Sequence, residues 1–390
     1  MVETLETPWH VIGASFVFFG GWLLLVFSCS VFGVGFKRAS VLYLWHTFFC
    51  LIYFWLSLYN VADATAYYLD ARTGRCDFSL GTAAVRSLTC VLIQVDLSYL
   101  GCFLVFNLFG AFGVIAFDGA LTSVVQNTSR RLRKLSTLLV LLPSVSYWSS
   151  SIGKDALAFM AASFALWSLL KIEKRTVLMS VSISIMLVVR PHIAAMLLLT
   201  FVVAVVFGGS VRPLSRIMLS IAAIVGSAII LPIALTYVGF DKTDVLMDYV
   251  ELAQAKNLGG GSSLDISSMS FPVQLFTYLF RPLPYEAHNL FSLAVSFENL
   301  LLLLLSLYAF GKAWVFHKSK DFSVSQNHYK GYMPRSVYYS LCSYVLFCWP
   351  IMASTTSNLG IAARQKWMFL PFVILLLVYS LSNKKAISIS

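Results

Sequence analysis

Residues 217–239 read IMLSIAAIVGSAIILPIALTYVG, a run that contains no charged side chain. A helix of about 20 apolar residues crosses the roughly 30 Å hydrocarbon layer of a bilayer. The run is therefore long enough to span a membrane, whereas a helix on the surface of a soluble domain alternates an apolar face with a charged one. This stretch indicates an integral membrane protein.

The composition of the whole chain agrees with that interpretation. Of the 390 residues 59% are hydrophobic and only 12% are charged, whereas soluble domains carry about 25% charged residues. So few charges cannot cover a water-exposed surface. We predict an all-α fold, a polytopic integral membrane helix bundle that forms a single membrane domain over residues 1–390.

Further apolar runs predict about eleven transmembrane helices. The four runs between residues 135 and 209 are each short for a full crossing, so they are either tilted crossings or re-entrant hairpins enclosed by protein. We expect crossings. The predicted spans are 9–35, 41–59, 88–116, 135–149, 155–170, 176–190, 193–209, 217–239, 288–311, 337–353 and 367–382.

The distribution of Lys and Arg predicts the orientation, because cytoplasmic loops carry an excess of both. The N-terminus holds Glu3 and Glu6 and no basic residue before the first span, which favours an outside start and argues against a cleaved signal peptide. We predict an N-out, C-in topology. It places 18 of the 28 basic residues inside: Lys37, Arg38, Arg130, Arg131, Arg133, Lys134, Lys171, Lys174, Arg175, Arg212, Arg216, Lys312, Lys318, Lys320, Lys330, Arg335, Lys384 and Lys385.

The net charge of +11 then follows from topology, and attraction to anionic lipid headgroups explains it. The basic residues are scattered over short loops, so membrane lipid is an expected partner and nucleic acid is not. Of the seven cysteines only Cys76 lies squarely in an outer loop. We therefore expect no disulfide framework, no metal site and no cofactor, although Asp70 and Asp77 leave a bound Mg²⁺ open.

Polar motifs gather at the predicted outer face. The turn 147–155, YWSSSIGKD, holds Lys154 beside Asp155. It is either an interfacial aromatic belt with Asp155 as a helix cap or a functional turn. Arg190-Pro191-His192 interrupts an apolar stretch, which either a snorkelling arginine at a helix break or a binding site would explain. We favour function for this second motif.

Three other segments belong to the same face. Arg281 begins RPLPYE at the end of a large outer loop, residues 240–287, and Arg364 lies at the entry to the last span. Asp63 opens the segment DATAYY after the second span. Asp96 and Glu298 fall inside predicted spans, where a carboxylate indicates function by default.

Together Lys154, Arg190, Arg281 and Arg364, with His192 beside Arg190, come from four separate outer boundaries. Several cations converging in a half-buried vestibule make an anion site, and arginine in particular forms paired hydrogen bonds with phosphate oxygens. The sequence thus predicts a phosphate-binding site at the outer face.

At this point the chain resembles bacterial multi-spanning glycosyltransferases that use polyprenyl-phosphate-linked sugars. The resemblance lies in Pro143…Trp148-Ser149-Ser150…Gly153-Lys154-Asp155, in Arg190-Pro191-His192 and in Asn358…Gly360…Arg364. Two overlapping groups are similar to it: the GT-C-type transferases, and the Wzy-like O-antigen or exopolysaccharide polymerases. The resemblance implies a GT-C-like bundle in a bacterial inner membrane, with an extra N-terminal helix before the acidic outer segment.

For the reaction, the resemblance implies polymerisation of undecaprenyl-(di)phosphate-linked oligosaccharide on the outer leaflet, or transfer of a single sugar from a polyprenyl phosphate. Asp63 would be the catalytic carboxylate, with Asp155 and His192 as alternatives. Arg190, Arg281 and Arg364 would hold the lipid diphosphate; Lys154 joins them on its chemistry alone, and Tyr68 and Trp148 are expected substrate contacts. A co-polymerase and a flippase are expected protein partners.

Two other classes remain open. A transporter or flippase needs discontinuous helices at mid-membrane and often an internal repeat. The sequence shows no repeat between its halves, and its polar residues gather at one face. A scaffold of a secretion complex would leave the cation cluster unexplained. We expect a glycosyltransferase.

Overall fold

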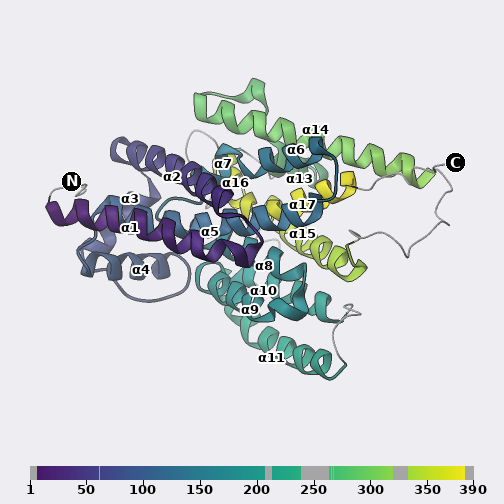
Figure 1. Ribbon diagram of the computed structural model, residues 1–390, viewed down its shortest axis with the longest axis horizontal. Helices are drawn as coiled ribbons and strands as arrows, with labels where there is room; N and C mark the ends of the chain where they lie inside the picture. The colour runs from purple at the N-terminus through teal and green to yellow at the C-terminus, as the bar shows by residue number, and fades with distance from the viewer. Residues whose placement is uncertain are drawn as a thin grey trace.

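The computed structural model describes residues 7–60, 62–206, 213–238, 263–264, 266, 268–318 and 333–382. Every regular element within these ranges is a helix (Figure 1). In chain order they are α1 (Pro8–Ser28), η1 (Cys29–Phe32), α2 (Phe36–Tyr59), α3 (Asp63–Arg72), α4 (Thr82–Gln94), α5 (Tyr99–Val125), α6 (Arg130–Val140), α7 (Pro143–Trp148), α8 (Lys154–Leu169), α9 (Ile172–Val189), α10 (Pro191–Val206), α11 (Pro213–Val238), α13 (Phe271–Phe280), η3 (Pro284–Glu286), α14 (Leu290–Lys318), α15 (Arg335–Thr355), α16 (Leu359–Gln365), η4 (Lys366–Met368) and α17 (Leu370–Ser382).

Six helices of the described chain are long and apolar enough to cross a membrane, which identifies a multi-pass helical membrane protein. They are Pro8–Phe32, Phe36–Tyr59, Tyr99–Val125, Ile217–Tyr237, Leu290–Lys312 and Arg335–Thr355. A seventh is the bent pair Leu359–Met368 and Leu370–Ser382, whose axes differ by 66°. The other predicted spans coincide with α6 to α10, which are too short or too charged to meet the same criteria, so the structure supports six or seven spans of the predicted eleven.

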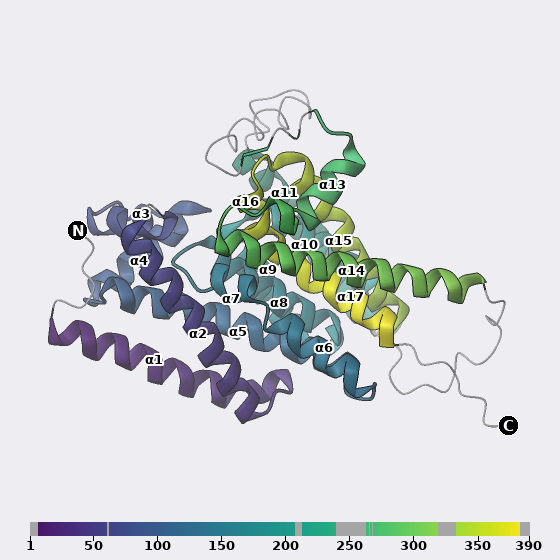
Figure 2. The ribbon, with the colours of Figure 1, turned by 90° about the horizontal axis from the view of Figure 1, so that it is seen from above.

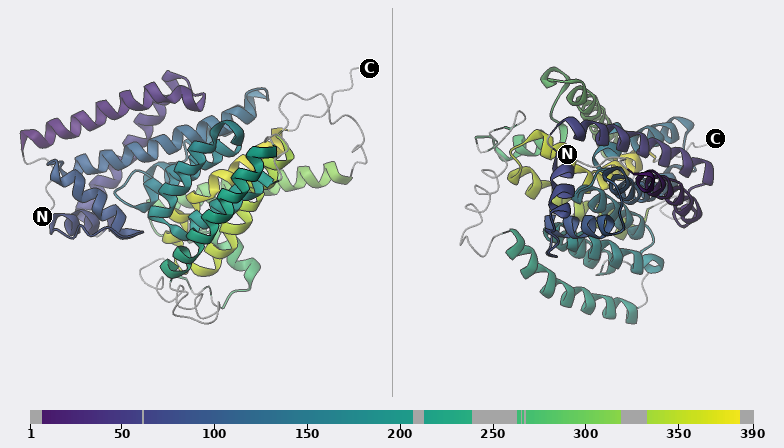
Figure 3. Two further views of the ribbon diagram at one scale, coloured as in Figure 1. Left: turned by 90° about the horizontal axis from the view of Figure 1, so that it is seen from below. Right: turned by 90° about the vertical axis from the view of Figure 1, so that its left-hand side faces the viewer.

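Helices α5 and α8 form the centre of the bundle (Figures 1 and 2). In α5, 72% of the most apolar 18-residue window is buried, against 22% in α1 and 12% in α11, which lie at the periphery (Figure 3). Glycines let neighbours approach α5 closely. A Cβ atom at Gly110 would lie 2.0 Å from the carbonyl oxygen of Ser149, so any larger residue would displace the turn that follows α7.

The predicted span 88–116 is wrong as a continuous helix. The chain breaks between α4 and α5, where Asp96 has a φ of +59° and Ser98 caps α5 by accepting a hydrogen bond from Gly101 N. The Asp96 side chain is 72% exposed and 3.7 Å from His10. Asp96 therefore lies in the turn that precedes the long apolar helix Tyr99–Val125 and not within that helix. The helix pair α3–α4 packs as a hairpin beside the beginning of α5.

The two ends of the bundle differ in charge. Arg38, in the first turn of α2, donates two hydrogen bonds of 2.6 Å to the buried Asp118 of α5 and a third to Thr137 of α6. This end, which we call the basic end, also carries Lys37, Arg130, Arg131, Arg133, Lys134, Lys171, Lys174 and Arg175. The 24 residues of α2 rise about 36 Å from there to Tyr59, at the opposite end.

The predicted outer loop 240–287 falls partly outside the described residues, which omit 239–262. Its described part contains α13, a cis peptide bond between Arg281 and Pro282, and η3. The basic residues Arg212, Lys320, Lys330, Lys384 and Lys385 also lie outside the described ranges.

Candidate functional site

A pocket of about 240 Å³ opens at the end of the bundle opposite the basic end. Its walls come from α2, α3, the turn between α7 and α8, the end of α9, and α16. Trp148, Lys154, Asp155, Arg190, Arg364 and Asp63, all predicted from the sequence, line it together with Tyr53, Tyr67, Ser151, Ile152, Gly153, Ile361 and Gln365.

The turn between α7 and α8 positions three of these side chains: Trp148 at the end of α7, and Lys154 and Asp155 at the beginning of α8. Pro143 occupies the first position of α7, where a missing N–H costs no hydrogen bond. The helix ends at Trp148, and the chain then passes against Gly110 before Lys154 begins α8. Three consecutive serines in this turn are buried, so the turn is held inside protein and fixes the direction of Lys154 and Asp155.

Four side chains of the pocket form a chain of alternating charge. Arg190 Nη2 lies 2.7 Å from Asp155 Oδ1, and Arg364 Nε lies 3.4 Å from Asp155 Oδ2. Arg364 Nη1 lies 2.6 Å from Asp63 Oδ2. Asp155 is thus held between two arginines, whereas Asp63 is paired at one oxygen only and its side chain is 53% exposed.

Lys154 has different surroundings. Its ammonium group donates a 3.2 Å hydrogen bond to the hydroxyl of Thr82, at the first residue of α4. Among the ion pairs of the described residues, none includes Lys154. Its charge is therefore the one in this pocket that a bound anion could neutralise without displacing a carboxylate.

Two buried nitrogens of the pocket residues lack a hydrogen-bond acceptor within the described chain, Trp148 Nε1 and Arg190 Nε, and Arg364 Nε has only its 3.4 Å ion pair with Asp155. Buried donors are almost always hydrogen-bonded in native proteins. Donors without acceptors beside an available ammonium form a site that complements an anion with several oxygens, such as a phosphate group.

The tyrosine of α3 that lines the pocket is the neighbour of the one predicted. Tyr67 lines the pocket, whereas Tyr68 is buried and packs on Tyr99 with ring centroids 4.9 Å apart. Burial raises the pKa of the Tyr67 hydroxyl, and the negative charges of Asp63 and Asp155 raise it further. Tyr67 therefore remains a neutral donor at physiological pH.

Two predicted residues lie away from the pocket. Arg281 is absent from its lining and pairs locally with Glu286, whose Oε1 accepts a 2.8 Å hydrogen bond from Arg281 Nε. Burial alone would raise the pKa of Glu286, but the hydrogen bonds from Arg281 and from Leu283 N outweigh it and hold the pKa below its ordinary value. His192 is half-buried and faces Tyr237, with ring centroids 6.0 Å apart.

A buried polar network lies behind the pocket, around the predicted intramembrane Glu298. Glu298 accepts hydrogen bonds from the backbone N and the hydroxyl of Ser144, in the first turn of α7. Trp367 donates to the same hydroxyl, and the buried Lys366 donates to Asn299. The network joins α14, α7 and η4, and so fixes α7, which carries Trp148, and η4, which directly follows the helix that carries Arg364.

The expectation that no disulfide forms is wrong. Cys76 and Cys90 are joined, linking the loop after α3 to α4. Sequence reasoning placed Cys90 inside a span, because it read the broken segment 88–116 as one helix. Gln365, which lines the pocket, and Thr82, which accepts from Lys154, were also missed, because nothing in the sequence distinguishes them from other polar residues near a helix end.

The described residues contain no group of three or more His, Cys, Asp or Glu side chains that could hold a metal ion. Comparison with known proteins identifies no relative: no protein-family model, no curated protein and no solved structure matches this chain.

Proposed function

We propose that this protein is a membrane glycosyltransferase that transfers or polymerises glycans from a polyprenyl-(di)phosphate carrier on the outer leaflet. The observation that carries the proposal is the pocket itself, where the ammonium of Lys154 has no ion-pair partner among the described residues, and Trp148 Nε1 and Arg190 Nε have no hydrogen-bond acceptor. A lipid-linked phosphate supplies the oxygens that these donors lack, and a multi-pass bundle gives its chain access from the bilayer.

In the proposed reaction an acceptor hydroxyl attacks the anomeric carbon of the lipid-linked sugar. The new C–O bond forms as the bond to the phosphate oxygen breaks, and the phosphate leaves with the bonding electrons. Lys154 and the arginines stabilise the charge that develops on it. Asp63 takes the hydroxyl proton, because it is the carboxylate of the pocket that is both exposed and free at one oxygen.

Asp155 has another role in this proposal. Both of its oxygens face arginines and its side chain is only 15% exposed, so it orders Arg190 and Arg364 and takes no proton. His192 takes no part in the proposed reaction, because it packs against Tyr237 and does not line the pocket.

The proposed arrangement in the bilayer keeps the predicted eleven passes and the N-out, C-in orientation in a bacterial inner membrane. Two observations support it. The basic end matches a cytoplasmic face, and the disulfide lies in the α3–α4 hairpin at the pocket end, where an oxidising compartment would preserve it. In this proposal the helices α8 to α10 cross the membrane in alternating directions, as the longer helices beside them do.

Asp63→Asn tests the reaction in proteoliposomes supplied with a lipid-linked oligosaccharide. The loss of a general base lowers the rate of transfer by about 10²–10⁴-fold, while binding of the lipid-linked substrate persists. Polymer of normal length from Asp63→Asn would exclude Asp63 as the base. No glycan product from the wild-type protein with any polyprenyl-linked donor would overturn the assignment to this class.

A flippase is the second candidate, because the pocket adjoins a broken helix. The bent pair α16–η4 and α17 turns by 66° beside Arg364, and discontinuous helices are common at the substrate sites of transporters. In cells, a flippase defect leaves lipid-linked repeat units on the inner leaflet, whereas a transferase defect leaves them on the outer one. The leaflet on which they accumulate in Asp63→Asn cells separates the two functions.

A further inference from the structure

Helix α3 of the disulfide-bonded hairpin α3–α4 forms part of the pocket wall, and α4 contacts a residue that lines it. Asp63 begins α3 and Tyr67 lies one turn further along, both lining the pocket. Thr82, the first residue of α4, accepts the hydrogen bond from Lys154. The packing of the two helices therefore relates the position of the proposed base, Asp63, to that of Thr82, the partner of the pocket cation.

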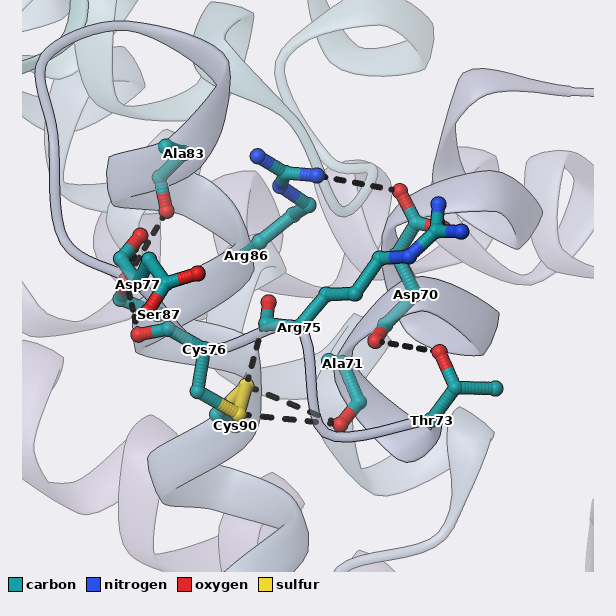
Figure 4. Close-up of polar contacts among 10 residues, drawn as sticks. All are labelled: Asp70, Ala71, Thr73, Arg75, Cys76, Asp77, Ala83, Arg86, Ser87 and Cys90. Atoms are coloured by element: carbon teal, nitrogen blue, oxygen red, sulfur yellow. Dashed lines mark hydrogen bonds and ion pairs between the residues drawn. A yellow bond between two sulfur atoms is a disulfide. The ribbon is translucent and has the colours of Figure 1, made fainter.

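Two links hold this hairpin in position. At one end the bond between Cys76 and Cys90 fastens the loop to α4 (Figure 4). At the other end Gly81 N donates a 2.8 Å hydrogen bond to Val188 O at the end of α9, two residues before Arg190. Gly81 has a φ of +82°, and a Cβ atom there would collide with the ring of Tyr237, so glycine is required at this contact.

The remaining contacts within the hairpin are weak by comparison. Asp70 pairs with Arg75 at 3.1 Å and with Arg86 at 3.3 Å, and Figure 4 shows both arginines reaching toward it. The Arg75 side chain is 69% exposed, and ion pairs exposed in this way contribute little to stability. The loop that precedes Thr82 is thus held by one covalent link, by hydrogen bonds from the Ser87 hydroxyl to Cys76 O and Asp77 O, and by the hydrogen bond from Gly81 N.

We propose that oxidation of the Cys76–Cys90 dithiol is the covalent step that assembles the pocket, making the hairpin a redox-dependent element of the site. The two thiols lose two protons and two electrons as the S–S bond forms. The electrons pass to the disulfide of a thiol-disulfide oxidant at the outer face, which becomes a dithiol. The effect of the bond on substrate binding rests on the proposed function. Its effect on the position of the hairpin does not.

The first test counts thiols in protein that is solubilised from its own membrane without reductant. After denaturation, an alkylating reagent should add to five cysteines, and to all seven once a phosphine reductant has been applied. Seven alkylated cysteines without reductant would overturn the proposal, because the bond would then be absent from the protein as it is made.

The second test asks whether the bond shapes the wall. Wild-type protein in nanodiscs is treated with phosphine reductant, and acetylation of Lys154 by a water-soluble amine reagent is followed by mass spectrometry. Loss of the constraint should raise the acetylation rate of Lys154 and the hydrogen exchange of α3 by about tenfold or more. Cys76→Ser and Cys90→Ser should reproduce the change without reductant, and Cys342→Ser, which alters a half-buried free thiol, should not.

Unchanged acetylation and exchange after verified reduction would overturn the proposal, because the wall would then be held without the bond. Both readouts are independent of any glycan substrate. If they change as expected while undecaprenyl phosphate does not bind oxidised protein, the proposed function fails and the redox-dependent wall stands. If undecaprenyl phosphate binds oxidised and reduced protein with equal affinity, the bond does not govern the pocket.

Discussion

Lys154 and Asp155 are neighbours in the sequence, yet their side chains have contrasting surroundings. The carboxylate of Asp155 faces two guanidinium groups, while the ammonium of Lys154 faces a neutral hydroxyl. A residue whose charge is neutralised by neighbours holds those neighbours in place. A residue whose charge has no such partner can attract a ligand of opposite charge. The two positions should therefore respond differently to substitution.

Lys154→Met should weaken binding of a polyprenyl phosphate by about 10–100-fold, because a hydrogen bond to a charged group contributes about 1.5–3 kcal/mol. Lys154→Arg should recover most of the affinity, since it retains the charge. Titration of purified protein with a fluorescent polyprenyl phosphate measures both. Lys37→Met, at the basic end, is the matched control. Wild-type affinity in Lys154→Met would remove Lys154 from the phosphate site.

Asp155→Asn should lower the stability of the protein far more than Asp63→Asn. It leaves the buried Arg190 without its carboxylate, and removing one partner of a buried pair costs about 3–5 kcal/mol. Asp63 is 53% exposed, so its loss should cost less than about 1 kcal/mol. Thermal unfolding in detergent compares the two. Equal melting temperatures would contradict the division of roles between them.

Helix α7 is the element on which the pocket depends most, and it is capped by another helix. Its preceding residue, Leu142, offers no side-chain cap, and Glu298 of α14 accepts from Ser144 N in its place. Helix α7 has only six residues and cannot be stable in isolation. Its contacts with α14 and η4 therefore set the position of Trp148.

Glu298→Gln should destabilise the bundle, because it leaves the ammonium of Lys366 without the carboxylate that interacts with it. Adding Lys366→Met should restore part of the loss, since the second change removes the uncompensated charge. A double-mutant cycle from thermal unfolding should show a coupling energy of at least about 1 kcal/mol. Additive effects of the two substitutions would show that the residues act independently.

Long apolar helices are predictable from the sequence, while breaks between them are not. The predicted spans 41–59 and 337–353 lie within α2 and α15, because each is a continuous apolar run that begins just after basic residues. The predicted span 88–116 joined two elements, since Asp96 was read as a buried charge when its left-handed backbone marks a turn. Hydropathy averages over such a position and cannot detect it.

The candidate site was also predictable only in part. Helix-end motifs identified Lys154, Asp155, Arg190, Arg364, Asp63 and Trp148, which the structure brings to one pocket. Arg281 resembled them in sequence, but a partner five residues away, Glu286, was already available to it. Charge and position predict that a residue faces the outer boundary. They do not predict which partner it takes there, because that depends on tertiary packing.

At the scale of the molecule, the charge difference between the two ends predicts how the protein is oriented. His288, exposed before α14, and Asn127, exposed after α5, lie at opposite ends of the bundle. A membrane-impermeant maleimide should label His288→Cys in intact cells, and Asn127→Cys only after the membrane is opened. The reverse order would invert the topology and place the pocket in the cytoplasm.

The contact between Asp63 and Arg364 has a consequence for how the protein is made. Their side chains meet across 301 positions of the chain, so Asp63 enters the membrane long before its partner has been translated. Contacts with large sequence separation form late, because the intervening chain must first be ordered. The ribosome therefore completes this pocket near the end of synthesis, and a nascent chain stalled before α16 carries an unneutralised carboxylate on an otherwise inserted bundle.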